Sequence, residues 1–288
     1  MNAFWDWWQH LPAHIDPVIF QIGSFRLQYY GLMYLVAFGT TYLLARYRLK
    51  NEKGWGVSID HLQGLMTTMI IGLIVGARLG YVLFYNMAYY AGHPLEIILP
   101  FQFQNGIRFT GISGMSYHGG LIGTLMGLWW YTHKYRLGAW KALDLLAPCG
   151  AAGYTFGRIG NFLNGELWGR VTTAPIGMHF PNAEGAALRH PSQLYEAFGE
   201  GILLFLILWS LRHRVRTPGV MFCCYLIGYG VIRFVIEFFR EPDAHLGFIF
   251  FSFSMGQLLC GSMIALGLIL MLLFFTVLRS NHEKGRPY

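Results

Sequence analysis

The apolar segment ALDLLAPCGAAGYTF (residues 142–156) runs directly into the polar segment GRIGNFLNGELWGR (residues 157–170). The first segment approaches the length that a helix needs to cross a hydrocarbon core about 30 Å thick. The second holds two arginines, two asparagines, a glutamate and four glycines within fourteen residues. Such polarity at the end of a hydrophobic segment indicates either an ordinary loop or a site where charge is held at a chosen membrane depth.

The composition of the 288 residues is that of a membrane protein. Hydrophobic residues make up 55% of the chain and charged residues only 12%, whereas an average soluble domain contains about 25% charged residues. The N-terminal residues MNAFWDWWQHLPAHIDP lack the features of a signal peptide, and their tryptophans are typical of an interfacial anchor. We therefore predict an all-α polytopic membrane protein that forms one integral membrane domain over residues 1–288.

Seven transmembrane helices are predicted from the hydrophobic runs. They cover residues 29–46, 62–87, 117–133, 142–158, 196–211, 219–238 and 255–278. Residues 159–195, between the fourth and fifth helices, are expected to form a small extracytoplasmic head segment.

Basic residues alternate between the two sides of this arrangement. Thirteen of the 21 lysines and arginines lie on one side, in residues 46–55, 133–141, 211–217 and 279–288. The positive-inside rule puts that side in the cytoplasm, so the N-terminus is predicted to be periplasmic (outside) and the C-terminus cytoplasmic. The net charge of +7 therefore reflects topology, and no nucleic-acid partner is expected.

Polar residues from five of the predicted spans lie near one depth in the outer leaflet. They are Tyr30, Arg78, His118, Arg158 and Arg233. An intramembrane arginine costs about 2.5–3.5 kcal/mol on insertion scales, so it normally faces a partner or a water-filled cavity. A single arginine is compatible with a side chain that snorkels to the surface, as expected for Arg170 or Arg240. Three arginines together with a histidine indicate a functional cavity.

Glycines at four-residue spacing predict close helix packing. They are Gly72, Gly76 and Gly80 in the second span, Gly119, Gly123 and Gly127 in the third, and Gly153 and Gly157 in the fourth. Because such ladders let helix backbones approach closely, we expect these three spans to pack together.

The segment YGVIRFVIEFFREPD (residues 229–243) places Tyr229, Arg233 and Glu237 at positions i, i+4 and i+8, on one face of a helix. Two interpretations stay open here. The Arg233–Glu237 pair can be a structural ion pair, and Glu237 can orient the guanidinium toward an anion such as phosphate; the two interpretations are compatible.

His118 begins the third span in GISGMSYHGGLIG (residues 111–123). A lone histidine at a helix start is more often structural, but its depth beside the arginines favours a proton acceptor that works near neutral pH. In RHPSQLYE (residues 189–196), Ser192 is the expected N-cap of the fifth helix. The four cysteines lie in apolar runs without metal-ligand spacing, so neither a metal nor another cofactor is expected.

Five segments together resemble the prolipoprotein diacylglyceryl transferase family. They are YYGLMY (29–34), GMSYHGG (114–120), GRIGNFLNGELWGR (157–170), RHPSQLYE (189–196) and GYGVIRFVIEFFREPD (228–243), and the resemblance runs from about Asp16 to the last span. It implies a multi-pass, monomeric enzyme of the bacterial inner membrane, whose active site faces the periplasmic (outer) leaflet. Its substrates would be the membrane lipid phosphatidylglycerol and the lipobox cysteine of a prolipoprotein signal peptide.

The resemblance also marks residues of this chain. It implies catalytic roles for His118, Arg158 and Arg233, and substrate-binding roles for Tyr30, Asn161, Glu166, Gly169, Tyr229 and Glu237. The implied reaction forms a thioether and releases glycerol phosphate, with His118 as base and the arginines on the phosphate.

Two other functional classes were weighed against this one. A transporter with an outward-facing anion site would carry polar groups at the midplane and an inverted repeat, neither of which is evident in the sequence. An intramembrane hydrolase would need a nucleophile motif, and no G-x-S-x-G occurs near His118.

Overall fold

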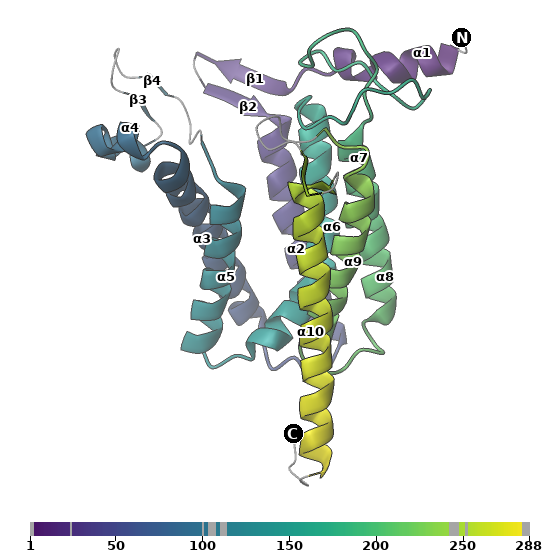
Figure 1. Ribbon diagram of the computed structural model, residues 1–288. Coiled ribbons are helices and arrows are strands. Elements are labelled where there is room, and N and C mark those ends of the chain that lie inside the picture. Colours follow the sequence, from purple (N-terminus) through teal and green to yellow (C-terminus); the bar gives the residue numbers. More distant parts are fainter. Residues whose placement is uncertain are drawn as a thin grey trace. The chain divides into compact units, whose positions relative to one another are not determined.

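The computed structural model describes residues 3–23, 25–99, 101–102, 108–109, 114–241, 248–250 and 253–283. Helices dominate these ranges (Figure 1). The chain divides into two compact units, which are described separately. Unit 1 comprises Met1–Pro17, Gln28–Leu44 and Leu143–Tyr288, and unit 2 comprises Val18–Leu27 and Ala45–Ala142.

Unit 1 is a helical bundle with an irregular segment at one end. Its elements are α1 (Ala3–His10), the 3-10 helix η1 (Leu11–His14), most of α2 (Tyr29–Asn51), α6 (Ala139–Leu163), α7 (Ser192–Glu196), the π-helix η3 (Ala197–Leu203), α8 (Leu204–Leu211), α9 (Val220–Ile236), the strands β5 (Phe248–Phe250) and β6 (Phe253–Ser254), and α10 (Met255–Glu283). Figure 1 shows α9 beside α10 and α8.

The core of unit 1 joins α6, α8 and α9. Its fully buried members are small or aliphatic side chains, namely Ala147, Ala151, Leu204, Leu208 and Met221. At one end of this core, the buried Asp144 carboxylate accepts the backbone N–H groups of Gly219 and Phe222 at 2.6 and 2.8 Å. Because Gly219 provides no side-chain cap, Asp144 satisfies the free N–H groups at the start of α9.

The irregular segment between α6 and α7 is fastened to α1. The Trp8 indole donates to the Ile176 carbonyl at 3.0 Å, and the Gln9 amide donates to the Pro175 carbonyl at 3.2 Å. Phe162, Met178 and Phe180 form a second buried cluster beneath this contact. The tryptophan-rich N-terminus therefore has a packing role within unit 1 in addition to any interfacial one.

Unit 2 is built on two closely packed helices, α3 (Ile59–Tyr85) and α5 (Tyr117–Lys134). Its other elements are the strand pairs β1 (Val18–Ile22) with β2 (Phe25–Gln28) and β3 (Phe101–Gln102) with β4 (Arg108–Phe109), together with α4 (Met87–Gly92) and the 3-10 helix η2 (Pro94–Ile97).

The predicted glycine ladders of α3 and α5 face each other. A Cβ atom added at Gly72 would overlap the Gly123 carbonyl oxygen, and one added at Gly80 would lie 2.9 Å from the Gly119 Cα. The packing of these two spans is therefore confirmed. In α6, Gly153 packs against Thr41 and Ala37 of α2, and a Cβ atom added at Gly157 would meet nothing within 4 Å among the described residues. The packing of this span against the other two stays a prediction.

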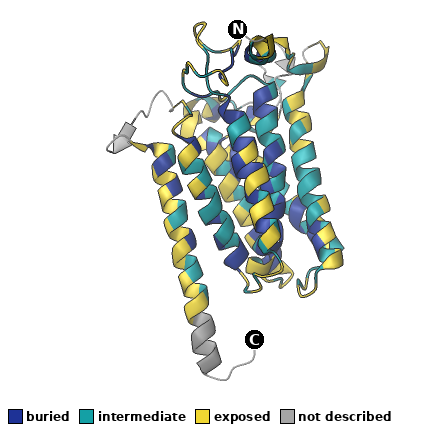
Figure 2. Cartoon of the chain, turned by 90° about the vertical axis from the view of Figure 1, so that its right-hand side faces the viewer, coloured by how far each residue is buried: buried dark blue, intermediate teal, exposed yellow. Residues whose placement is uncertain are grey.

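Many apolar side chains on the helices are exposed, as expected of surfaces that face lipid. Figure 2 shows exposed residues along most of the helix that leads to the C-terminus, α10, where Leu266, Ile269 and Leu272 point outward. Three described helices are long and apolar enough to cross a membrane, Ile59–Tyr85, Ser192–Leu211 and Met255–Thr276. The other four predicted spans coincide with α2, α5, α6 and α9.

Short antiparallel strand pairs accompany the helices, which dominate the fold as the sequence predicts. One detail differs from the sequence prediction. The fourth helix ends at Leu163 instead of residue 158, because Gly160 fits against Met33 and Tyr30 and Phe162 is buried beneath the irregular segment. Residues 157–163, predicted to be the end of a span and the start of a turn-rich segment, are therefore helical.

Candidate active site

A buried ion-pair cluster lies where α6, α7, η3 and α9 meet in unit 1. Its members are three arginines and three glutamates: Arg158, Arg233, Arg240, Glu196, Glu200 and Glu237. Equal numbers of opposite charges compensate one another, which a buried group of charges requires. We refer to these six residues as the ion-pair cluster.

Glu196 connects the three arginines. Its Oε2 lies 2.7 Å from Arg158 Nε, and its Oε1 lies 2.8 Å from Arg233 Nη1 and 3.6 Å from Arg240 Nη1. The residue is 0% exposed. The sequence favoured a snorkelling side chain for Arg240. The side chain instead belongs to the cluster, because its guanidinium pairs with this carboxylate.

Glu200 lies one turn beyond Glu196 and is also fully buried. It accepts a hydrogen bond of 2.5 Å from the Tyr154 hydroxyl and lies 3.4 Å from Arg233 Nη1. The Tyr154 oxygen in turn accepts from Arg158 Nε at 2.6 Å and lies 3.4 Å from the Tyr229 hydroxyl. Tyr229, predicted to bind substrate, therefore belongs to the polar network around the arginines.

The π-helix η3 explains how both acids reach the arginines. Its glycines allow close contact on two sides, since a Cβ atom at Gly201 would lie 2.9 Å from the Thr155 Cα of α6, and one at Gly199 would lie 2.8 Å from Ile232 of α9. Single π-turns within helices are rare and often occur at functional sites. Here the π-turn wedges the acidic helix between the two helices that carry Arg158 and Arg233.

Arg158 and Arg233 are each bound by several protein groups, but these groups do not use every nitrogen of the guanidinium. Arg158 uses Nε for Glu196 and Tyr154 and Nη1 for Asn161 at 3.3 Å, while Arg233 uses Nη1 and Nη2 for glutamates. Within the part of the chain that the structure describes, Arg158 Nη2 and Arg233 Nε donate to no protein group. Both side chains keep some exposure, 15% and 12%. Each arginine therefore retains a donor that can take an anion.

The predicted ion pair between Arg233 and Glu237 is confirmed, with Nη2 and Oε2 3.0 Å apart. The other oxygen of Glu237 accepts a hydrogen bond from the Ser254 hydroxyl at the start of α10, also at 3.0 Å. Glu237 is buried, and these two partners hold its two carboxylate oxygens in place.

Asn161 and Glu166 lie together at the end of α6. The Asn161 amide donates to Glu166 Oε1 at 2.8 Å. Glu166 lies in a turn where Gly165 and Leu167 both have positive φ, and a leucine adopts that conformation only under strain. The turn is held from α7, because Ser192 donates to the Leu167 carbonyl at 2.9 Å and Gln193 donates to the Glu166 carbonyl at 2.6 Å.

Ser192 is therefore not the N-cap that the sequence predicted. Pro191 occupies the cap position without a side-chain hydrogen bond, and the Ser192 hydroxyl is used across the interface to the turn instead. Tyr30 packs beside Gly160, near Asn161 and Glu166, and its hydroxyl lies 3.0 Å from that of Tyr34. Tyr30, Asn161 and Glu166 are thus brought together.

Gly169 has a packing role that the sequence did not reveal. It pairs with Arg240 in an isolated β-bridge, and a Cβ atom there would overlap the Phe239 carbonyl oxygen and lie 2.8 Å from two atoms of His190. Glycine is required for this crossing of chain segments, which sets the position of the backbone that carries Arg240.

His118 and Arg78 belong to unit 2. His118 lies in the first turn of α5 behind the N-cap Ser116, is exposed, and contacts the ring of Tyr117. Arg78 donates to the carbonyl oxygens of Glu96, Ile97 and Gly114 at 2.6, 2.9 and 3.2 Å. These bonds fasten the segment after α3. The convergence of five polar groups at one depth stays a prediction.

Three participants were missed by the sequence analysis: Tyr154, Glu196 and Glu200. A signal for the two acids was present, because two glutamates four residues apart in an otherwise apolar span are costly unless they are paired. The tyrosine carries no comparable signal, since tyrosines are common in apolar segments.

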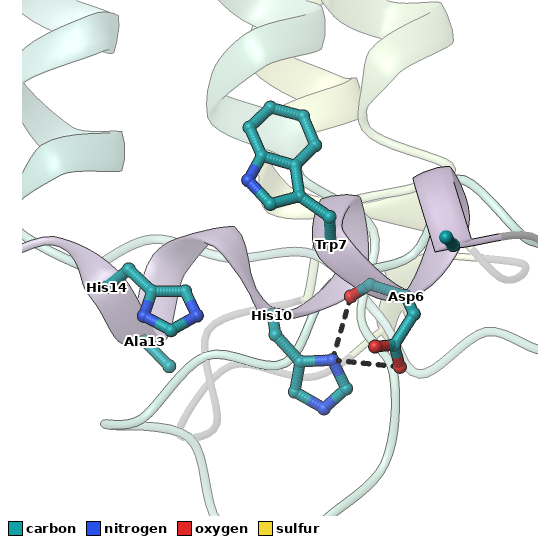
Figure 3. Close-up of a pocket in the computed structure, with 6 residues that line it drawn as sticks. Asp6, Trp7, His10, Ala13 and His14 are labelled. Carbon is teal, nitrogen blue, oxygen red and sulfur yellow. Dashed lines mark hydrogen bonds and ion pairs between the residues drawn. The ribbon is translucent and has the colours of Figure 1, made fainter.

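A separate pocket lies on α1 and η1, lined by Ala3, Asp6, Trp7, His10, Ala13 and His14 (Figure 3). Its polar groups bind each other, with His10 Nδ1 2.9 Å from the Asp6 carbonyl oxygen. It contains none of the predicted site residues. Among the described residues, no group of three or more histidine, cysteine, aspartate or glutamate side chains could hold a metal ion.

Comparison with known proteins identifies the family. Residues 17–273 match the family of prolipoprotein diacylglyceryl transferases. The chain belongs to this family. It is 52% identical to the phosphatidylglycerol–prolipoprotein diacylglyceryl transferase of Chlorobaculum tepidum over 271 residues, which cover 93% of each chain. It is 44% identical to the enzyme of the same name from Geobacter sulfurreducens, over 90% of this chain and 95% of that one.

Family membership makes the chain a transferase of lipoprotein lipidation. The alternative of a membrane transporter has no support in these similarities. Several residues of unit 1 that the resemblance marks lie close together in the structure. Some belong to the ion-pair cluster and others to the Asn161–Glu166 turn.

Proposed function

We propose that the chain transfers the diacylglyceryl group of phosphatidylglycerol to the thiol of a lipobox cysteine, forming a thioether and releasing glycerol phosphate. One observation carries this proposal. Arg158 and Arg233, from two different helices, share the buried carboxylate of Glu196, while each keeps one nitrogen that donates to no protein group among the described residues. Such preorganised guanidinium groups suit a phosphate on which charge grows during the reaction.

The reaction displaces the phosphate from a glycerol carbon. The thiolate sulfur attacks that carbon, an S–C bond forms, the C–O bond breaks, and the electron pair stays on the phosphate oxygen. Arg158 and Arg233 bind this leaving group, and Glu237 orients Arg233. Tyr30, Asn161, Glu166, Gly169 and Tyr229 surround the head group. A free thiol with a pKa near 8.5 is only partly ionised at neutral pH, so His118 takes its proton.

A reconstituted reaction tests the proposal. The purified protein is mixed with phosphatidylglycerol labelled in its diacylglyceryl group and a peptide with a lipobox cysteine. We expect the label to reach the peptide through a thioether, and a peptide with serine in place of that cysteine to stay unlabelled. Label that is released as free diacylglycerol, or that does not leave the lipid, would overturn the proposal.

The role of His118 has its own test. If His118 takes the thiol proton, His118→Gln loses activity near neutral pH and recovers part of it at alkaline pH, where more thiolate is present. If His118→Gln keeps full turnover at neutral pH while Arg158→Ala and Arg233→Ala lose it, His118 is a positioning residue instead.

We further propose that the enzyme is a monomer with seven spans in the bacterial inner membrane. The N-terminus and residues 159–195 lie on the periplasmic side, and the active site opens to the outer leaflet. The basic segments 46–55, 133–141 and 211–217 support this orientation through the positive-inside rule. Reporter fusions after Lys53 and at the C-terminus should both report the cytoplasm, and a periplasmic signal from either would contradict the orientation.

A further inference from the structure

The first turn of α10 is closed by a reciprocal capping box. The Ser254 hydroxyl accepts the backbone N–H of Gln257 at 3.2 Å, and the Gln257 side chain accepts the backbone N–H of Ser254 at 3.0 Å. Both residues are 3% exposed. This arrangement satisfies two of the free N–H groups that every helix start presents.

The Ser254 hydroxyl does more than cap the helix. A hydroxyl has one proton to donate in addition to its acceptor lone pairs. Ser254 uses a lone pair for the cap and its proton for Glu237 Oε1, 3.0 Å away. A residue that starts α10 therefore also fixes one oxygen of a glutamate at the end of α9.

Gly256 brings the same carboxylate onto the helix itself. A Cβ atom at this position would lie 2.5 Å from Glu237 Oε1, 2.7 Å from its Cδ and 3.1 Å from Oε2. The carboxylate thus packs against the bare Cα of the glycine. This is the positive end of the α10 dipole, which favours a negative charge.

The contacts continue from Glu237 to the arginine. Its second oxygen, Oε2, lies 3.0 Å from Arg233 Nη2. Ser254 and Gly256 therefore set where the carboxylate lies, and the carboxylate sets the orientation of the guanidinium plane. This leaves Arg233 Nε as the donor that faces no protein group within the described residues.

We propose that Ser254 and Gly256 are positioning residues for the transfer reaction, because they fix Glu237 and, through it, Arg233. This inference rests on the proposed function of Arg233. The competing explanation is that the two residues only stabilise the start of α10.

Two substitutions, compared by their turnover per folded molecule, separate these explanations. Ser254→Ala removes an N-cap and lowers the melting temperature. Gly256→Ala raises helix propensity, but its methyl displaces the buried Glu237 carboxylate from Ser254 and Arg233, so the melting temperature also falls. If positioning is the role, both variants lose turnover, by about 10- to 100-fold, because the guanidinium is displaced. If the role is only structural, Gly256→Ala keeps full turnover.

The same helix offers matched controls. A Cβ atom at Gly261 meets nothing within 4 Å, and the Ser262 hydroxyl is exposed and bonds only within its own helix turn. Gly261→Ala and Ser262→Ala should keep both stability and turnover. Loss of turnover in Gly261→Ala would show that any alanine in α10 is harmful and would overturn the inference.

A double-mutant cycle tests the route through Glu237. In a Glu237→Ala background, Gly256→Ala should reduce turnover much less than it does in the natural protein, because the side-chain end that its methyl displaces is already absent. Additive losses would refute the route. Arg233→Lys distinguishes the two proposals: if it stays active, the proposed function of Arg233 fails, whereas an inactive Arg233→Lys with an active Gly256→Ala refutes only the positioning role.

Discussion

Two buried arginine environments, one in each unit, satisfy the guanidinium group in different ways. In unit 2, Nε, Nη1 and Nη2 of Arg78 each donate to a backbone carbonyl, and the guanidinium lies 4.9 Å from the centre of the Tyr90 ring. In unit 1, Arg158 and Arg233 are held by glutamate side chains and each leaves one nitrogen without a protein partner among the described residues.

The difference separates a structural arginine from one suited to bind an anion. Each nitrogen of Arg78 donates to a neutral backbone carbonyl, which fastens the guanidinium to the chain without compensating its charge. The carboxylates around Arg158 and Arg233 fix the planes of the guanidinium groups and compensate their charges, and one nitrogen of each donates to no protein group among the described residues. We therefore expect changes at Arg78 to affect stability and changes in the ion-pair cluster to affect turnover.

The largest effect is expected for Arg233→Lys. An ammonium group cannot contact Glu196, Glu200 and Glu237 and still present a donor to phosphate, so turnover should fall by roughly 100- to 1,000-fold. The measurement is the rate of diacylglyceryl transfer to a lipobox peptide at saturating lipid. The matched control is Arg214→Lys, an exposed arginine of the same unit, which should keep full turnover.

Glu196→Gln should affect both turnover and stability. An amide has no negative charge to share among three arginines, and breaking a buried ion pair typically costs about 3–5 kcal/mol. We expect a lower melting temperature in detergent and a turnover reduced by about 10- to 100-fold, because Arg158 and Arg233 lose their common partner.

Asp144→Asn provides the comparison for Glu196→Gln. Asp144 is another buried acid of unit 1, but its carboxylate bonds to the backbone at the start of α9. Its neutral variant should lose stability and keep its turnover per folded molecule. Equal losses of turnover in the two variants would show that helix stability, and not charge balance in the cluster, limits the reaction.

Arg78→Met tests the other side of the comparison. The substitution leaves three carbonyl oxygens without their donor, and each buried acceptor that loses its partner costs about 1–3 kcal/mol. We expect a lower melting temperature and a turnover per folded molecule within about twofold of the natural protein, because the hydrogen bonds of Arg78 go to the backbone. A large loss of turnover without a loss of stability would place Arg78 in the substrate site, and Arg78 would then not be a purely structural arginine.

Sequence patterns predicted the elements well and the contacts between them less well. Each of the seven predicted spans falls on a helix, because long apolar runs determine helices in lipid regardless of their neighbours. The Arg233–Glu237 pair was predicted because both residues lie on one helix. Local spacing is enough for such features.

The features that escaped prediction depend on residues far apart in the chain. Glu196 meets Arg158 and Arg233 only because the π-turn and its glycines place α7 between two other helices. Ser192 looked like an N-cap, yet its hydroxyl bonds to a turn 25 residues earlier. Arg240 looked like a surface residue until the Gly169 crossing set its backbone. Such contacts depend on tertiary packing, and tertiary packing leaves no regular spacing of residues in a single sequence.

The smallest expected effect concerns the segment that leads into α7, where Gly169 crosses His190. Partial burial lowers the pKa of His190 below its ordinary value of 6.5. The unfolded chain therefore takes up this proton at a higher pH than the folded protein does. The contribution of His190 to stability is complete above about pH 6.5 and decreases as the pH falls below that value.

His190→Gln should weaken this dependence. Glutamine can keep a hydrogen bond to the Tyr195 hydroxyl, which lies 3.1 Å from His190 Nδ1, but it takes up no proton. The difference in melting temperature between about pH 7.5 and about pH 5 should be smaller in this variant than in the natural protein. Acidic residues contribute equally to the pH dependence of both proteins, so any change in it comes from His190. His213→Gln, a substitution at an exposed histidine, is the control and should leave the difference in melting temperature unchanged. An unchanged pH dependence in His190→Gln would mean that protonation of His190 does not affect the stability of the fold.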